Sequence, residues 1–220
     1  MKRAAILLLA AALMPGALQA RPGQVVWRFD NLEHIGGLTP LVLGEPRVVD
    51  TPIGAAIAFD GLDDAIYLDR HPLAGAARFT AEAIFRPDGG AFEQRWMHLA
   101  SHDPGDQTRM LFEIRVVGNS WYLDTFVKGP GYAQALIDPA RLHSIGRWYH
   151  VAQTFDGTTY RSYVDGVLEG EARVAFRPQG PGRTSVGVRY SRVSFFHGAV
   201  RMARFSREAL APSQFRMVRK

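Results

Sequence analysis

The sequence predicts an all-β fold in which two antiparallel sheets pack face to face as a sandwich. Short runs of β-branched, aromatic and aliphatic residues recur along most of the chain, with turn-forming residues between them. Two of the turns contain the pairs Asp156-Gly157 and Asp165-Gly166, which provide the positive φ angles of tight hairpins. Only residues 139–143 and 206–215 have a helical pattern, and both segments are short. These observations favour consecutive antiparallel strands over any helical fold.

Turn-forming residues lie between the expected strands, which are rich in residues that suit a pleated surface. In chain order they are residues 25–29, 56–59, 65–68, 79–85, 96–100, 110–117, 121–127, 148–155, 160–164, 173–176, 184–188 and 198–205. Their regular spacing is typical of a sandwich or a barrel.

The N-terminal residues 1–20 have the pattern of a secretory signal peptide. Lys2 and Arg3 form a positive start, residues 4–14 are continuously apolar, and Pro15-Gly16 ends this run before Ala20. The apolar segment is too short to span a bilayer comfortably, and no later stretch is long and apolar enough. We therefore expect cleavage after Ala20 and export to the periplasm or the extracellular space.

The remaining residues 21–220 are expected to form a single domain, because 200 residues suit one large β-sandwich. The chain has no cysteine, which excludes disulfides and a lipid-anchored cysteine. Without residues 1–20 the formal charge falls from +5 to +3, and the arginines are spread along the chain. No basic run is interleaved with aromatic residues, so we expect no nucleic-acid partner.

Strand parity predicts one strongly polar sheet face, because alternate residues of a strand point to opposite sides of the sheet. The rule separates polar from apolar side chains in residues 79–86, 110–117 and 121–128. If these strands are neighbours, one sheet face carries Glu82, Arg86, Glu113, Arg115, Tyr122, Asp124 and Lys128.

The segment 93–103 places an acid, an amide, a guanidinium group and an imidazole within a few residues. Arg95 lies near His98 in the sequence, and Trp96 offers an aromatic surface, as does Tyr132 further on. A histidine in a strand is more often a hydrogen-bonded structural residue, and this is the alternative for His98.

Several motifs, taken in their order and spacing, carry a resemblance to a known family. They are Phe59-Asp60-Gly61-Leu62-Asp63-Asp64, residues 79–87, Trp148 to Val167, residues 184–188 and residues 196–212. Together they resemble the laminin G-like members of the concanavalin A-like lectin/glucanase superfamily. The chain departs from the family pattern at Arg201-Met202, where members commonly carry Asp-Glu. The resemblance implies a two-sheet jelly roll.

In jelly-roll proteins the outer sheet face can hold a glycan, and polar side chains with aromatic rings are the groups that bind sugars. We therefore expect a carbohydrate-binding, lectin-like module. The expected ligand-binding residues are Glu82, Arg95, Trp96, His98, Glu113, Arg115, Tyr122, Asp124 and Lys128. The alternative is an exposed face held by cross-strand ion pairs, with no ligand.

Two further functions remain open. Some jelly-roll polysaccharide lyases use Gln, His, Arg and Tyr on this face to act on acidic glycans. By analogy, the catalytic candidates here would be His98 or Tyr122 as the base, with Arg95, Gln94 or Arg115 neutralising the uronate. A glycoside hydrolase needs two facing carboxylates, and among the acids only Glu113, Glu82 and Asp124 could converge. A protein-interaction or adhesion module is the other possibility.

The resemblance also implies calcium, which is a common companion of the family. Asp60, Asp63 and Asp64 are the candidate ligands, because calcium is held by carboxylate and carbonyl oxygens. The alternative is that these side chains accept hydrogen bonds from backbone amides and only shape the turn. The seven histidines show no spacing typical of metal ligands.

Overall fold

A computed structural model describes residues 23–103 and 107–218 of the chain. The predicted signal peptide, residues 1–20, lies outside these residues, so the signal and its cleavage site stay predictions. Within the described part, no helix has the length and apolar character needed to cross a lipid bilayer.

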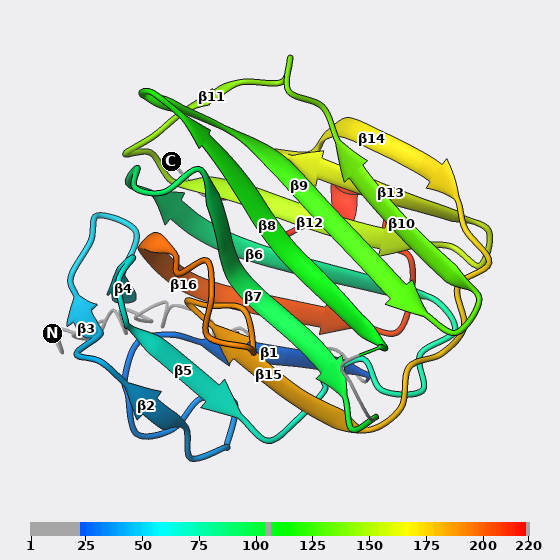
Figure 1. The fold of residues 1–220 in the computed structure, drawn as a ribbon, viewed down its shortest axis with the longest axis horizontal. Coiled ribbons are helices and arrows are strands. Elements are labelled where there is room, and N and C mark those ends of the chain that lie inside the picture. Colours follow the sequence, from blue (N-terminus) through cyan, green and yellow to red (C-terminus); the bar gives the residue numbers. More distant parts are fainter. Residues whose placement is uncertain (1–22, 104–106, 219–220) are drawn as a thin grey trace, which may run out of the picture.

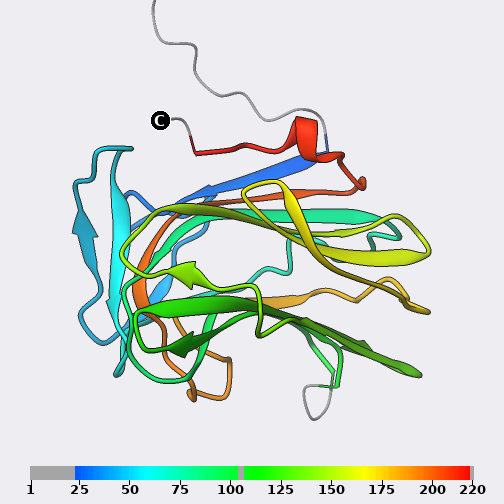
Figure 2. The same ribbon diagram turned by 90° about the horizontal axis from the view of Figure 1, so that it is seen from above.

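Two antiparallel sheets pack face to face (Figures 1 and 2), which confirms the predicted sandwich. Sheet I has the order β14-β13-β12-β6-β16-β4-β3, with β1 also pairing with β16. Its strands are β1 (Gln24–Arg28), β3 (Arg47–Val49), β4 (Ala56–Asp60), β6 (Phe79–Pro87), β12 (Tyr149–Phe155), β13 (Thr159–Val164), β14 (Val167–Arg173) and β16 (His197–Ser206).

Sheet II has the order β10-β9-β8-β7-β15-β5-β2, with β11 also pairing with β9. Its strands are β2 (Leu41–Leu43), β5 (Ala65–Leu68), β7 (Glu93–Ser101), β8 (Arg109–Val117), β9 (Ser120–Gly129), β10 (Tyr132–Ile137), β11 (His143–Ser144) and β15 (Gly182–Val186). In the described residues helical structure is confined to the 3-10 turn at Pro212–Gln214. The helical expectation for residues 139–143 was wrong, because His143 and Ser144 pair with β9 instead.

The predicted hairpin in sheet I forms as the aspartate-glycine pairs require. Asp165 and Gly166 have φ angles of 47° and 78°, and the Asp165 carboxylate accepts a hydrogen bond from the backbone N–H of His150 at 2.9 Å. At the preceding turn, Oδ1 of Asp156 accepts hydrogen bonds from the N–H groups of Thr158 and Thr159. Each side chain therefore fixes the turn that the sequence predicts.

The inner faces of the two sheets meet in a core dominated by aromatic rings. Phe85 of sheet I lies 5.3 Å from both Trp96 and Trp121 of sheet II, measured between ring centroids. A polar bridge also crosses this core. Gln153 of β12 donates to the backbone oxygen of Leu111 at 3.2 Å and accepts from the Tyr160 hydroxyl at 2.6 Å. This bridge ties β8 of sheet II to sheet I.

The C-terminal segment covers the outer face of sheet I (Figure 2, red). Leu210 and Phe215 pack with Ala152 and Tyr163 in a small apolar cluster, and the Phe215 ring stacks on His150 at 5.2 Å. The chain therefore fills this face with its own residues, whereas sheet II lies on the other side of the sandwich.

Candidate functional site

The polar side chains of β8 and β9 lie on one face of sheet II, as parity predicts. The two strands pair so that Glu113 is opposite Asp124 and Arg115 is opposite Tyr122. The alternating residues Met110, Phe112, Ile114 and Val116 are buried in the core. The sheet face that carries Glu113, Arg115, Tyr122 and Asp124 is called here the outer face of sheet II.

A β-bulge on β7 adds both Arg95 and His98 to this face. The pairing of β7 with β8 shifts between Arg95 and Met97, so that Arg95 is opposite Glu113 and His98 is opposite Leu111. Residues three apart in a regular strand point to opposite faces, and the extra residue of a bulge removes this difference. The sequence indicated the two residues as neighbours, but not the bulge that makes them so.

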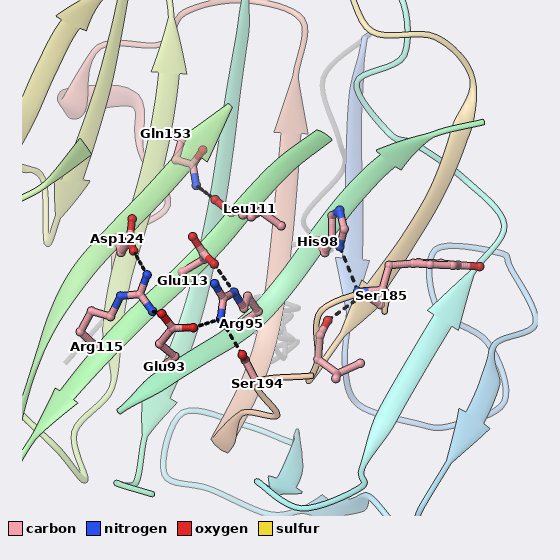
Figure 3. A network of polar contacts seen from close by, with 12 residues as sticks. Glu93, Arg95, His98, Leu111, Glu113, Arg115, Asp124, Gln153, Ser185 and Ser194 are labelled. Carbon is pink, nitrogen blue, oxygen red and sulfur yellow. Dashed lines mark hydrogen bonds and ion pairs between the residues drawn. The ribbon is translucent and has the colours of Figure 1, made fainter. Parts of the chain in front are cut away.

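Five alternating charges form a continuous ladder across β7, β8 and β9 (Figure 3). Arg115 contacts Asp124 at 2.6 Å and Glu93 at 2.8 Å. Arg95 contacts the other oxygen of Glu93 at 2.7 Å and also forms an ion pair with Glu113. The ladder of Asp124, Arg115, Glu93, Arg95 and Glu113 therefore pairs each guanidinium group with two carboxylates.

The ladder is largely removed from water, and this shifts the acidity of its carboxyl groups. Burial raises the pKa of Glu113 to about 7 and raises that of Asp124, although Arg95 and Arg115 oppose both shifts. Glu93 lies at the centre of the ladder and is its most exposed member, and its hydrogen bond from Arg95 lowers its pKa. Because of Glu113, the ladder changes its charge near neutral pH.

His98 lies beneath a loop of residues 187–196 that borders the ladder. Its side chain is fully buried, and Nδ1 accepts a hydrogen bond from the backbone N–H of Tyr190 at 2.9 Å. Burial, and then the nearby charges of four arginines, lower the pKa of His98 to about 3. The imidazole is therefore neutral and holds the loop, and it has no open route to a substrate proton.

Tyr122 and Lys128 complete the predicted face. Tyr122 is almost fully buried opposite Arg115, and Lys128 is half-buried, with its ammonium group donating to Gln107 at 2.8 Å. Of the nine predicted ligand-binding residues, seven come together on the outer face of sheet II. They are Arg95, His98, Glu113, Arg115, Tyr122, Asp124 and Lys128.

The placement of Glu82 and Arg86 on this face was wrong. Both belong to β6 of sheet I, which pairs with β12 and β16. Glu82 is fully buried under the C-terminal segment, where it binds His150 at 2.9 Å and the guanidinium group of Arg204. Alternation shows which residues of a strand share a face, but it does not show which sheet the strand joins. The prediction failed for this reason.

Trp96 was also misplaced as a sugar platform. The bulge turns its ring inward, where it is 1% exposed and packs between Phe85 and Phe112. Gln94 is buried as well, and its amide donates to the backbone oxygens of Gly89 and Ala91. Tyr132 lies in the core. These side chains hold the fold and do not face a ligand.

Sequence reasoning missed a second group on the same face. β15 pairs with β7 so that Arg183 is opposite Ala100 and Ser185 is opposite His98. Ala100 is in turn opposite Arg109, and Arg109 is opposite Lys128. Across the sheet the row therefore reads Arg183, Ala100, Arg109 and Lys128, which is three cationic side chains and one small residue. Alternation in residues 183–185 was the available signal, since Arg183 and Ser185 flank an inward-facing threonine.

The three candidate calcium ligands come together in the structure. Asp60, Asp63 and Asp64 each have an oxygen atom within 4.8 Å of the others. Both oxygens of Asp64 accept backbone N–H groups, from Glu45 at 2.7 Å and from Asp60 at 2.9 Å. Burial opposes ionisation of Asp60, but hydrogen bonds from Leu62, Asp63 and other amides outweigh it and lower its pKa.

The donor set suits calcium, because all of its ligand atoms are carboxylate oxygens. The cluster also lines a pocket that contains Glu45 and Arg47. Calcium at Asp60, Asp63 and Asp64 therefore stays a prediction that the geometry permits.

Two antiparallel sheets with this strand order, packed around an aromatic core, define a jelly-roll β-sandwich. A family model described as the concanavalin A-like lectin/glucanases superfamily matches residues 59–215. The chain belongs to this family, which confirms the resemblance. No curated protein matches the chain.

Solved structures with the same fold include domain 4 of AbnA, an extracellular arabinanase from Geobacillus stearothermophilus, in complex with arabinotriose. It is 18% identical, with a TM-score of 0.57 over 86% of this chain and 94% of that domain. Another is the CBM40 of a Ruminococcus gnavus sialidase bound to sialyllactose. It is 15% identical, with a TM-score of 0.56 over 78% of this chain and 95% of that one.

A sialidase from Trypanosoma rangeli is 16% identical, with a TM-score of 0.62 over 88% of this chain. The match spans only 32% of the sialidase. At such identities the likeness establishes the fold, and the function must be argued from the residues of this chain.

Proposed function

We propose that this chain is an exported carbohydrate-binding module that holds a glycan on the outer face of sheet II. The observation that carries the proposal is the difference between the two outer faces. That of sheet I is covered by Leu210 and Phe215 of the C-terminal segment, whereas that of sheet II carries an ordered ladder of charged groups. A face with fixed polar side chains and nearby rings suits a sugar, whose hydroxyl groups need oriented partners.

The aromatic surface that sugar binding needs comes from residues beside the ladder. Phe126 of β9 is half-buried on the outer face, and the guanidinium carbon of Arg109 lies 5.5 Å from its ring centroid. Tyr190 of the 187–196 loop is also half-buried and projects over His98. A pyranose can place its C–H groups against such rings while its hydroxyls bond to the ladder.

Binding is favoured over catalysis because the ionisable groups of the face already have partners. Glu113, Asp124 and Glu93 are each bound by an arginine. A general base must reach the proton that it removes, and His98 is fully buried beneath the loop. One observation favours the enzymatic alternative: the raised pKa of Glu113 is a property of general acids in glycosidases.

Two comparisons and one sequence pattern support the remaining parts of the proposal. The arabinanase domain and the CBM40 were each solved with an oligosaccharide. The arabinanase is an extracellular enzyme, and residues 1–20 of this chain have the pattern of a secretory signal. We infer that the chain acts outside the cytoplasm, in the periplasm or beyond.

The test is retention of the purified protein on a panel of neutral and acidic polysaccharides in affinity electrophoresis. Phe126→Ala is expected to weaken binding about tenfold, the effect of losing about 1.4 kcal/mol. Leu168→Ala on β14 of sheet I removes an exposed apolar side chain and serves as the matched control. Retention that Phe126→Ala leaves unchanged would contradict the proposed face.

The same incubations separate binding from catalysis. Reducing ends and unsaturated-uronate absorbance are followed in parallel, with and without calcium. Binding without product supports a module. New reducing ends without uronate absorbance would instead make the chain a hydrolase, and Glu113→Gln would then abolish the product. Uronate absorbance would make the chain a lyase.

A further inference from the structure

Two arginines on the outer face of sheet II differ from those of the ladder. Arg95 and Arg115 each contact two carboxylates. In the described residues, no carboxylate lies within ion-pair distance of Arg183 or Arg189, although the Nε atom of each is buried and forms no hydrogen bond. Unlike the ladder arginines, these two guanidinium groups have no carboxylate partner among the described residues, so an anion would neutralise their charge.

These arginines surround a second group that lacks a partner. Nε2 of His98 is buried and has no hydrogen-bond partner in the described structure. Arg189 and Arg183 both lie close enough to the imidazole to disfavour its protonation. Among the described residues no carboxylate pairs with Arg183 or Arg189 to relieve the positive potential around His98, whereas both arginines of the ladder are paired with carboxylates.

The cluster is also held in a defined shape. The guanidinium carbon of Arg183 lies 3.8 Å from the centroid of the Tyr190 ring, and this ring meets Tyr67 edge to face at 5.2 Å. An arginine stacked on an aromatic ring loses little further freedom when it binds, because its planar fork is already oriented.

The loop that carries Arg189 and Tyr190 is fixed to the ladder and is strained. Arg95 donates to Oγ of Ser194 at 2.6 Å, and its backbone N–H donates to the Ser194 carbonyl at 3.0 Å. Arg192 and Ser194 have φ angles of 59° and 60°, which residues other than glycine rarely adopt. Such strain persists where surrounding contacts impose it, and it is concentrated at ligand sites.

We propose that Arg183, Arg189 and Tyr190 bind the carboxylate of an acidic sugar. The carboxylate accepts hydrogen bonds from the two arginines, and the sugar ring lies against Tyr190. Planar guanidinium groups match a carboxylate in geometry as well as in charge. This inference rests on the proposed function, because it names the class of glycan that the outer face of sheet II accepts.

The experiment compares acidic glycans with neutral partners by isothermal titration calorimetry. One pair is polygalacturonate and its methyl ester, and a second pair is sialyllactose and lactose. Arg183→Gln and Arg189→Gln test the cluster, and Arg173→Gln on β14 of sheet I is the matched control. Arg183→Lys keeps the positive charge but lacks the planar guanidinium group that can donate two parallel hydrogen bonds. It provides a second test if Arg183→Gln fails to fold.

The acid of at least one pair is expected to bind about tenfold or more tightly than its neutral partner. Each glutamine variant should weaken it about tenfold to a hundredfold, the range for a hydrogen bond to a charged group. Raising the salt concentration should weaken binding further, because the cluster is partly exposed. Arg173→Gln should leave the affinity unchanged.

Three results would overturn the inference, and they differ in what they imply for the proposed function. Equal binding of acid and ester, or binding of neutral glycans alone, removes the carboxylate site but leaves a carbohydrate-binding module. Equal binding of polyglutamate, an anionic polymer without sugars, shows attraction by charge alone. Failure to bind any glycan in the panel removes the proposed function together with this inference.

Discussion

Glu113 provides a quantitative test of the ladder, because its buried carboxyl group links protein stability to pH. Its pKa is raised from 4.5 to about 7 in the folded protein. Between these values the folded state binds more protons at this side chain than the unfolded state does. Stability must therefore fall as the pH rises from 4.5 to 7.

The size of the effect follows from the same values. Each tenfold change in the proton dissociation constant corresponds to about 1.4 kcal/mol, so the full difference is about 3 kcal/mol. Glu113→Gln keeps the shape of the side chain but removes the titration. Relative to this variant, the free energy of unfolding of the wild type is expected to fall by about 3 kcal/mol between pH 4.5 and 7. It should not fall further above about pH 8.

The assay is urea unfolding of both proteins at intervals from pH 4 to pH 9. Glu33→Gln removes an exposed carboxylate elsewhere and controls for the change in net charge. A stability difference that is constant with pH would refute the reasoning. A wild type that gains stability relative to the variant would show that the Arg95 ion pair outweighs the cost of burial.

Four other predictions follow from the structure. Glu82→Ala should destabilise the fold by about 3–5 kcal/mol in urea unfolding, because it leaves Arg204 buried without its carboxylate partner. Glycan affinity should not change, and a loss of affinity would show that Glu82 belongs to the binding site. Trp96→Ala should cost about 3–5 kcal/mol as a core truncation, and milder destabilisation would place the ring at the surface. His98→Leu removes the hydrogen-bond acceptor for the Tyr190 amide and should lower the free energy of unfolding by about 1–3 kcal/mol. Hydrogen exchange of the Tyr190 amide should become faster in this variant, and an unchanged rate would contradict the role of His98. Millimolar calcium is expected to raise the Tm of the wild type but not that of Asp63→Asn. If the Tm of the wild type is the same with and without calcium, the three aspartates only shape the turn.

The architecture could be predicted from the sequence because local signals determine it. The turns at Asp156-Gly157 and Asp165-Gly166 follow from residues that tolerate positive φ angles, and the alternation in residues 110–128 follows from the pleat of a strand. The pairing of Glu113 with Asp124 then needs only a short turn between β8 and β9, which are adjacent in the chain.

Other parts of the site could not be predicted, because they depend on contacts between distant segments. The sheet to which Glu82 belongs is decided by the pairing of β6 with β12 and β16. The inward turn of Trp96 is decided by a bulge that no local motif announces. Arg183 reaches the outer face of sheet II only because β15 inserts between β7 and β5.

The central claim is that a glycan lies on the outer face of sheet II, and chemical-shift mapping of the isotope-labelled protein tests it most directly. A bound oligosaccharide from the panel is expected to shift the backbone amides of Phe126, Lys128 and Tyr190, with little change in β12 and β13. Shifts confined to Asp60, Asp63 and the adjoining pocket, or to the C-terminal segment over sheet I, would contradict the account.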